Sequence, residues 1–160
     1  MTRKVILLIL IFLNLSTIFF FSHQSAEKSG ALSDGLSHQI EIRTPDYETK
    51  NQVEKNMLHV TWRKQVRRLA HVALFLSLGV LVSLFLWDGS FSWGRTAGGI
   101  LFGVLCSFGD EIHQLFVPGR TFQWHDIGND ILGYFSGMVL CGLVFGMLSF
   151  RKWRFSKKAK

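Results

Sequence analysis

The stretch that decides the fold runs from Val5 to Phe21 and reads VILLILIFLNLSTIFFF, 17 residues with one Asn and no charge. Crossing ~30 Å of hydrocarbon at ~1.5 Å per residue takes about 20 apolar residues in a helix. Two later runs are similar: Leu69–Trp87 has 19 residues with His71 as its only ionisable group, and Ile131–Phe150 has 20 without charge. The sequence therefore predicts an all-α integral membrane protein.

A fourth segment, Thr96–Phe108, is apolar over only 13 residues and is followed by acidic residues. Because Pro118 lacks a backbone donor and would end a helix, we read this segment as a helix of full length whose last turns carry polar side chains at the membrane boundary. The predicted fold is a four-helix membrane bundle in a single domain, residues 1–160, with spans at about 5–21, 69–87, 96–116 and 127–150.

Charge distribution orients the predicted bundle. The net charge is +7, and six of the 18 Lys and Arg residues lie in the tail 151–160, which contains no acid. A basic, aromatic tail after a membrane span is typical of contact with anionic lipid on the cytoplasmic side and argues against nucleic acid as a partner. Lys and Arg counts tie between the two sides, but the first loop also carries six acids. We therefore expect both termini to be cytoplasmic.

The two ends of the first span raise further expectations. No small-residue cleavage site follows the span, so we expect an uncleaved anchor. The loop that follows runs from about Ser22 to Gln65 and is polar. Within it, Leu32, Leu36 and Ile40 recur at helical spacing, which predicts a short amphipathic surface helix that ends near Pro45.

Polar residues form stripes on the last two predicted spans. On the third span the stripe follows steps of three and four and comprises Gly99, Gly103, Ser107, Asp110 and Gln114, flanked by Glu111 and His113. If Asp126 caps the fourth span, one of its faces carries Asp126, Asn129, Asp130, Gly133, Gly137 and Cys141. Small residues four apart let membrane helices approach closely. We expect these two spans to pack small face to small face, which would gather the acids at one end.

The second predicted span adds basic partners, because Lys64, Arg67, Arg68 and His71 lie on one face where it enters the membrane. Arginine can hold a phosphate or carboxylate in a fork. Singly, each polar residue has an ordinary interpretation, such as a cap for Asp126 or a headgroup anchor for the arginines. Jointly, three segments converge with complementary charge, and ionisable groups at membrane depth indicate function. Imidazole and carboxylate could bind a metal, but no HExxH or paired CxxC spacing occurs, so we predict no metal and no cofactor.

Three stretches resemble the VanZ-like family of membrane proteins. Residues 110–120 read DEIHQLFVPGR and are similar to the family's DE-x-x-Q-x-x-x-x-x-R signature; residues 21–25 read FSHQS, like its FS-x-Q-S motif; and residues 67–75 resemble its RK-x-x-H-x-x-x-Y pattern. Arg68 stands where Lys is usual, and Phe75 replaces a Tyr, which removes a hydroxyl from that position. The resemblance covers nearly the whole chain. It implies a small multispanning protein of the bacterial cell envelope with a link to resistance against the glycopeptide antibiotic teicoplanin.

Two functions fit these residues. In the first, an outer-face site binds an anionic lipid-linked or cell-wall component without changing it. In the second, the protein is an interfacial enzyme; a small transporter subunit is a third, weaker interpretation, because four spans without a repeat make a poor alternating-access unit. Candidate acid–base residues are Asp110, Glu111 and His113. Candidate binding residues are Gln24, Arg67, Arg68, His71, Gln114, Arg120, Asp126, Asn129 and Asp130.

Overall fold

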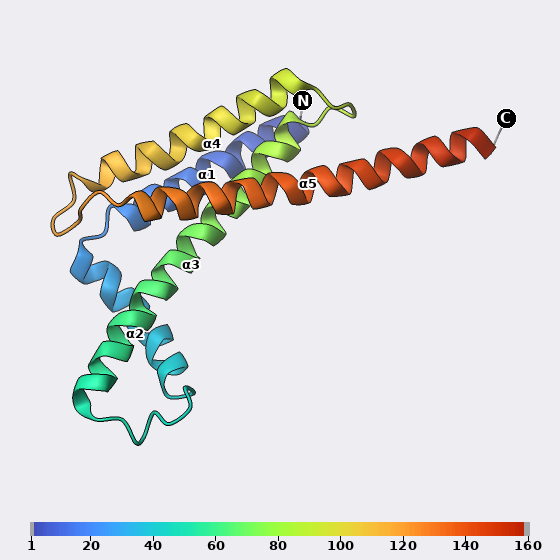
Figure 1. Ribbon diagram of the computed structural model, residues 1–160. Coiled ribbons are helices and arrows are strands. Elements are labelled where there is room, and N and C mark those ends of the chain that lie inside the picture. The colour runs from blue at the N-terminus through green and yellow to red at the C-terminus, as the bar shows by residue number, and fades with distance from the viewer. Residues whose placement is uncertain (1, 159–160) are drawn as a thin grey trace.

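The computed structural model describes residues 2–158, with the side chains of residues 2, 26, 27, 30, 32 and 150–158 outside the described part. Over this part of the chain every regular element is an α-helix, which confirms the predicted all-α class. The helices are α1 (Thr2–Ser22), α2 (Ala26–Glu41), α3 (Gln52–Leu86), α4 (Trp93–Gln114) and α5 (Trp124–Lys158). Helix α3 is central: it packs most extensively on α5 and also contacts α1, α2 and α4 (Figure 1).

Three described stretches are long and apolar enough to cross a membrane: Arg3–Ser22 in α1, Gln52–Leu86 in α3 and Trp124–Ser149 in α5. Helix α4 is not among these candidate spans, although its 22 residues would be long enough to cross a membrane. Its apolar part is short because polar side chains occupy its last turns. The predicted bundle of four spans is therefore not matched in full. The predicted basic tail, 151–160, continues α5 as far as Lys158, but its side chains lie outside the described residues.

Helix α3 begins well before the predicted span. Asn51 and Glu54 form a capping box, in which the Asn51 side chain accepts from the Glu54 amide and the Glu54 carboxylate accepts from the Asn51 amide. Such reciprocal bonds satisfy two free donors of a helix start. The second half of the predicted loop up to Gln65 is therefore helical from Gln52 onward. The N-terminal half of α3 extends away from the other long helices and pairs with α2 (Figure 1).

Helix α2 confirms that the first connection contains a helix, but its buried face is polar. Four residues spaced one turn apart are buried: Ser29, Ser33, Ser37 and Glu41. Glu41 contacts His59 of α3, with 2.8 Å between Oε1 and Nδ1. By contrast Leu36 is exposed and Ile40 is partly exposed, and the side chain of Leu32 lies outside the described residues. The serines thus let α2 approach α3, while Leu36 faces outward, where a membrane surface could cover it.

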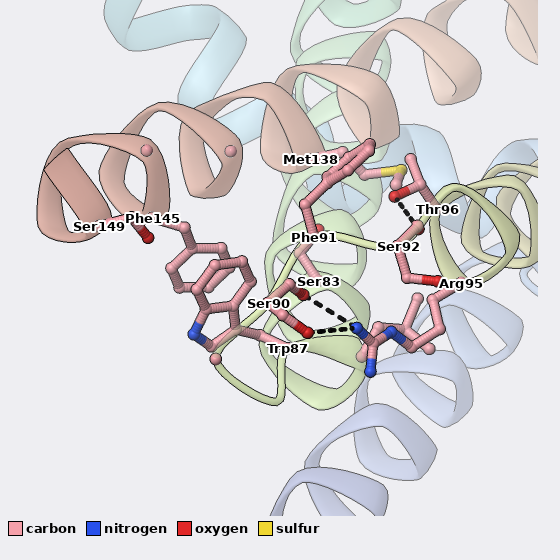
Figure 2. A pocket seen from close by; sticks show the side chains of 14 residues that line it. Ser83, Trp87, Ser90, Phe91, Ser92, Arg95, Thr96, Met138, Phe145 and Ser149 are labelled. Carbon is pink, nitrogen blue, oxygen red and sulfur yellow. Dashed lines mark hydrogen bonds between the residues drawn. The ribbon is translucent and has the colours of Figure 1, made fainter. Parts of the chain in front are cut away.

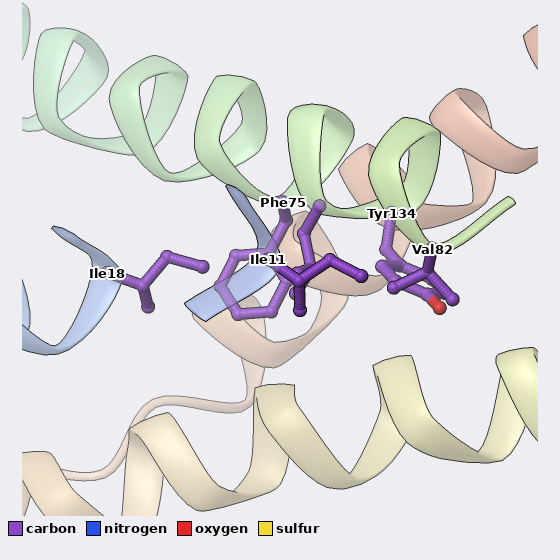
Figure 3. Close-up of a cluster of buried hydrophobic side chains, with 6 residues drawn as sticks. Ile11, Ile18, Phe75, Val82 and Tyr134 are labelled. Carbon is purple, nitrogen blue, oxygen red and sulfur yellow. The ribbon is translucent and has the colours of Figure 1, made fainter. Parts of the chain in front are cut away.

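The apolar core lies where α1 and α5 meet the second half of α3 (Figure 3). It contains Ile11 and Ile18 from α1, Phe75, Leu78 and Val82 from α3, and Tyr134 from α5. The one Asn of the first span, Asn14, donates to Ser77 Oγ of α3 through Nδ2, whereas its Oδ1 is buried without a hydrogen-bond partner among the described residues. Most other apolar side chains of α1 are exposed, as expected for a helix whose outer face meets lipid.

Glycines decide how closely the helices approach, but they pair differently from the prediction. A Cβ on Gly133 or Gly137 would collide with the backbone of α3, at Val72 O and Leu76 O respectively, and a Cβ on Gly79 would collide with Tyr134 O. Gly103 of α4 instead faces the ring of Tyr134, whose hydroxyl donates to Gly99 O at 2.7 Å. The expected small-face packing of α4 on α5 is therefore wrong, because an aromatic ring separates these two helices. The backbone contact joins α3 and α5.

Candidate functional site

Three ionisable side chains from three helices meet inside one end of the bundle. His71 Nδ1 of α3 lies 3.5 Å from Asp130 Oδ1 of α5 and 3.9 Å from Asp110 Oδ2 of α4. All three residues are buried, Asp130 completely. Gly133 of α5 lies directly against the backbone of α3 at Val72. His71 immediately precedes Val72, and Asp130 lies about one turn before Gly133, so this contact holds the two side chains together. The structure thus brings together three of the residues that the sequence pointed to.

Gln114, at the end of α4, connects these acids to the arginines. Its Nε2 donates to Asp110 Oδ2 at 2.8 Å. Its Oε1 accepts from Arg67 Nη2 at 3.4 Å and from Arg120 Nη1 at 3.3 Å. A buried amide that receives two guanidinium groups can hold the adjacent carboxylate in one orientation. Gln114 is therefore a positioning residue between Asp110 and the basic side chains.

Arg120 joins the α4–α5 loop to the end of α1. Its Nε donates to Gln24 O at 3.1 Å and its Nη2 to Phe21 O at 3.4 Å. The side chain of Gln24, predicted to bind a ligand, instead donates to Phe20 O near the end of α1. All three guanidinium nitrogens of Arg120 thus have protein acceptors. The predicted binding residues Gln24 and Arg120 lie at the site, but there they link the α4–α5 loop to the segment that follows α1.

Glu111 lies on the side of α4 that faces the α4–α5 loop. It is fully buried, and its Oε2 accepts from the amide of Gln123 at 2.8 Å. Its Oε1 is buried without a hydrogen-bond partner among the described residues. Nearby, Ser107 Oγ donates to Ile127 O at 3.3 Å, which fastens α4 to the start of α5. Glu111 is therefore held by one oxygen and has the other free for a proton or a ligand.

His113, the third candidate acid–base residue, contacts α1. Its Nε2 lies 3.3 Å from His23 Nδ1, and its ring stacks on Phe19 with the centroids 4.3 Å apart. The imidazole that contacts the buried carboxylates is that of His71, from α3. Of the predicted acid–base set, Asp110 therefore lies beside His71, and His113 belongs to a separate pair of histidines.

A basic cavity of about 390 Å³ opens between α2, α3 and the start of α5. Its lining residues are Ser29, Ser33, Val60, Arg63, Lys64, Arg67, Arg68, Gln123 and Asp126. Helix α5 begins at Trp124, so Asp126 lies in its first turn and is not the predicted cap. It pairs instead with Arg67, with 3.9 Å between Oδ2 and Nη2. Among the described side chains that line this cavity, four are basic and one is acidic, which makes the lining positive.

Two features connect the basic cavity with its surroundings. A narrow cleft adjoins the basic cavity and is lined by Arg67, Arg68, His71, Asp126 and Asn129. Asn129, the remaining predicted binding residue, therefore also lies at the site. Arg63 of the cavity was missed by the sequence interpretation. It could have been found, because it precedes Arg67 by four residues and therefore lies on the same helix face.

An apolar groove of about 460 Å³ lies between α1 and α4 and reaches the same buried cluster from another side. Its lining is mostly apolar, with Phe12, Leu15, Ile18 and Phe75 among its residues, but it ends at Asp110 and His113. Asp110 is thus accessible from an apolar surface, whereas Arg67 faces the basic cavity.

A further cavity, of about 440 Å³, lies at the opposite end of the molecule between the α3–α4 connection and α5 (Figure 2). Trp87 and Phe145 stack there with their ring centroids 4.3 Å apart. Among the described residues of its lining, Arg95 is the one that carries a charge, and it is paired with Asp88 and Ser90. Since that lining is mainly apolar, the described groups suited to acid–base or ligand chemistry concentrate at the other end.

Comparison with known proteins agrees with the resemblance seen in the sequence motifs. A family model described as VanZ/LLP1 matches residues 5–146. No curated protein and no solved structure is significantly similar to the chain.

Proposed function

The chain belongs to the VanZ/LLP1 family, and we propose that it is a multi-pass protein of the bacterial cell membrane that binds the anionic head group of a lipid-linked or cell-wall component. The observation that carries this proposal is the basic cavity. Arg67 and Arg68 offer planar guanidinium groups of the kind that bind phosphate or carboxylate through two parallel hydrogen bonds. The polar contacts of Arg67 are long, at 3.4 Å to Gln114 and 3.9 Å to Asp126, so a phosphate could replace them with shorter ones.

The apolar groove supports a ligand that carries a hydrocarbon chain. It lies between α1 and α4, among helices whose outer faces expose many large apolar side chains. A lipid could enter such a groove sideways without leaving the hydrocarbon. The buried cluster around Asp110 lies between this groove and the basic cavity, so a head group bound to Arg67 and Arg68 would approach the acids. This arrangement favours a membrane-anchored ligand over a soluble one.

The proposed orientation places the site on the outer face of the membrane. Arg3 donates to Leu84 O near the α3–α4 connection, so the N-terminus lies at the end opposite to the site. With cytoplasmic termini, as the basic tail favours, the basic cavity faces outward. A reporter fused after Lys160 should then be active inside the cell. Activity confined to the outside would reverse this orientation.

Replacing the two arginines tests the proposed binding. In nanodiscs, we expect the protein to bind a fluorescent polyprenyl diphosphate at least about tenfold more tightly than the same polyprenol without phosphate. Arg67→Gln combined with Arg68→Gln should abolish this difference, because charge-assisted hydrogen bonds contribute about 1.5–3 kcal/mol each and a tenfold change needs about 1.4 kcal/mol. Fluorescence anisotropy measures both affinities.

A matched control comes from the same helix. Lys55→Gln also removes a positive charge from α3, but Lys55 packs over the Tyr47 ring away from the cavity. Its affinity for the diphosphate should stay within about twofold of wild type, since Lys55 does not line the cavity and water and salt screen its charge. Equal affinity for the two polyprenols in the wild-type protein, or equal losses in both variants, would contradict a head-group site in this cavity.

A specific observation also favours the enzymatic alternative, in which Glu111, Asp110 and His113 act as acid–base groups. Glu111 is fully buried, anchored at one oxygen and free at the other, as a positioned general acid or base would be. Profiles of envelope lipids and wall precursors separate the two functions. In a strain whose teicoplanin resistance depends on this protein, Glu111→Gln should change these profiles only if the protein catalyses; unchanged profiles with retained resistance leave binding as the function.

A further inference from the structure

The buried cluster of His71, Asp110 and Asp130 has the arrangement of a cation site. One ligand atom from each of these residues lies within 4.8 Å of the other two. Each comes from a different helix, α3, α4 or α5. Because the three helices are joined by backbone contact and by Gln114, the three donors are held in place before any ligand arrives. A site of this kind does not depend on the basic cavity or on its ligand.

The bonding of these side chains points to a missing cation. Asp130 is 0% exposed, yet neither carboxylate oxygen has a hydrogen-bond partner in the described part of the chain. The same is true of His71 Nδ1, the nitrogen that faces both acids. Burying a carboxylate that accepts no hydrogen bond is among the most unfavourable arrangements in a protein. Such groups are expected where a cation or a proton completes the structure.

The distances favour an ion over a simple imidazolium–carboxylate pair. Charge-assisted N–H···O bonds are about 2.7–2.9 Å long, whereas His71 Nδ1 is 3.5 Å and 3.9 Å from its two carboxylates. Two donors bound ~2.1 Å from one ion are separated by about 3.0–3.6 Å for angles between 90° and 120°. The shorter separation lies within that range and the longer one slightly beyond it, and both exceed the length of a direct charge-assisted hydrogen bond.

We propose that His71, Asp110 and Asp130 bind a divalent transition-metal ion. An imidazole nitrogen with two carboxylate oxygens suits Zn²⁺ or Mn²⁺, whereas Ca²⁺ and Mg²⁺ prefer oxygen alone. With neutral His71, the two carboxylates carry a charge of −2, which a divalent ion balances. Gln114 donates a hydrogen bond to Asp110 Oδ2, and a bond of this kind typically orients a carboxylate that binds a metal. Three protein donors leave at least one coordination position open, as in catalytic rather than structural metal sites.

Metal binding can be measured on the full-length protein in detergent micelles. After treatment with a chelator, the protein should take up about one equivalent of Zn²⁺ or Mn²⁺, retain it through desalting, and unfold at a higher temperature than before. Asp130→Asn, His71→Ala and Asp110→Asn should each weaken binding at least about tenfold, since each removes one of only three protein donors. Elemental analysis and thermal unfolding provide the two readouts.

The control is Asp88→Asn, which changes the same residue type at the opposite end of the bundle, where Asp88 pairs with Arg95, and should keep one equivalent of metal. If a ligand variant fails to fold, X-ray absorption of Mn²⁺ or Zn²⁺ on the wild-type protein still decides the question: one imidazole and carboxylate oxygens are expected. Wild-type protein that takes up no stoichiometric metal, or Asp130→Asn protein that retains as much as wild type, would overturn the proposal. Neither result would bear on head-group binding by Arg67 and Arg68.

Discussion

Gly137→Ala is expected to destabilise the protein by about 3 kcal/mol, although it adds a single methyl group. The added Cβ would collide with Leu76 O and lie 2.9 Å from Val80 N. These are backbone atoms of α3, which cannot rotate away as a side chain could, so the two helices would have to separate. Their separation would loosen the core around Phe75 and Tyr134 and would move His71 away from Asp130.

Gly142→Ala provides the matched control on the same helix, because no atom of the described residues lies within 4 Å of a Cβ at that position. An Ala in a helix interior is about 1 kcal/mol more favourable than Gly, so this variant should be as stable as wild type or slightly more stable. Unfolding by SDS in mixed micelles, followed by circular dichroism, compares the two variants. Similar stability of Gly137→Ala and Gly142→Ala would show that α3 and α5 do not make the described backbone contact.

The close approach of α3 and α5 also explains which parts of the site were predictable. Helical periodicity decides which residues share a face, and the stripe from Gly99 to Gln114 is indeed the buried face of α4. Periodicity does not reveal which helix lies opposite that face. Gly133 and Gly137 were therefore assigned to the wrong partner, while Gly79, inside an apolar run, carried no visible signal. The partner of a small residue depends on the shape of the whole bundle.

For the site, too, the sequence indicated which residues share a helix face but not which residues of other helices they contact. His71, Asp110 and Asp130 were all predicted to be near one another, because charge inside apolar segments is expensive and must be shared. The partners of His113 and Arg120 were not predictable, since both point toward the end of α1. Two of the family motifs are in direct contact at this point. Arg120 of the DEIHQLFVPGR stretch donates hydrogen bonds to the carbonyl oxygens of Phe21 and Gln24 in the FSHQS stretch.

Arg120→Ala is accordingly expected to lower the free energy of unfolding by about 3 kcal/mol. Arg120 is only 9% exposed, and its loss would remove the guanidinium donor of Phe21 O and of Gln24 O and one of the two guanidinium donors of Gln114 Oε1. Arg120→Lys should recover less than half of the loss, because an ammonium group cannot reach three acceptors that a planar fork reaches together. SDS unfolding measures stability, and hydrogen exchange at residues 21–25 should rise in both variants.

Arg95→Ala is the control for Arg120→Ala, because it removes the same side chain from the opposite end of the bundle. Arg95 pairs with Asp88 near the surface, where the two side chains are 32% and 46% exposed. Exposed pairs contribute at most about 1 kcal/mol, so this variant should unfold nearly as wild type does. If Arg120→Ala is equally stable but loses polyprenyl diphosphate binding, Arg120 contacts the ligand. If it loses stability and Arg120→Lys does not restore it, Arg120 instead fastens α1 to the loop that carries the site.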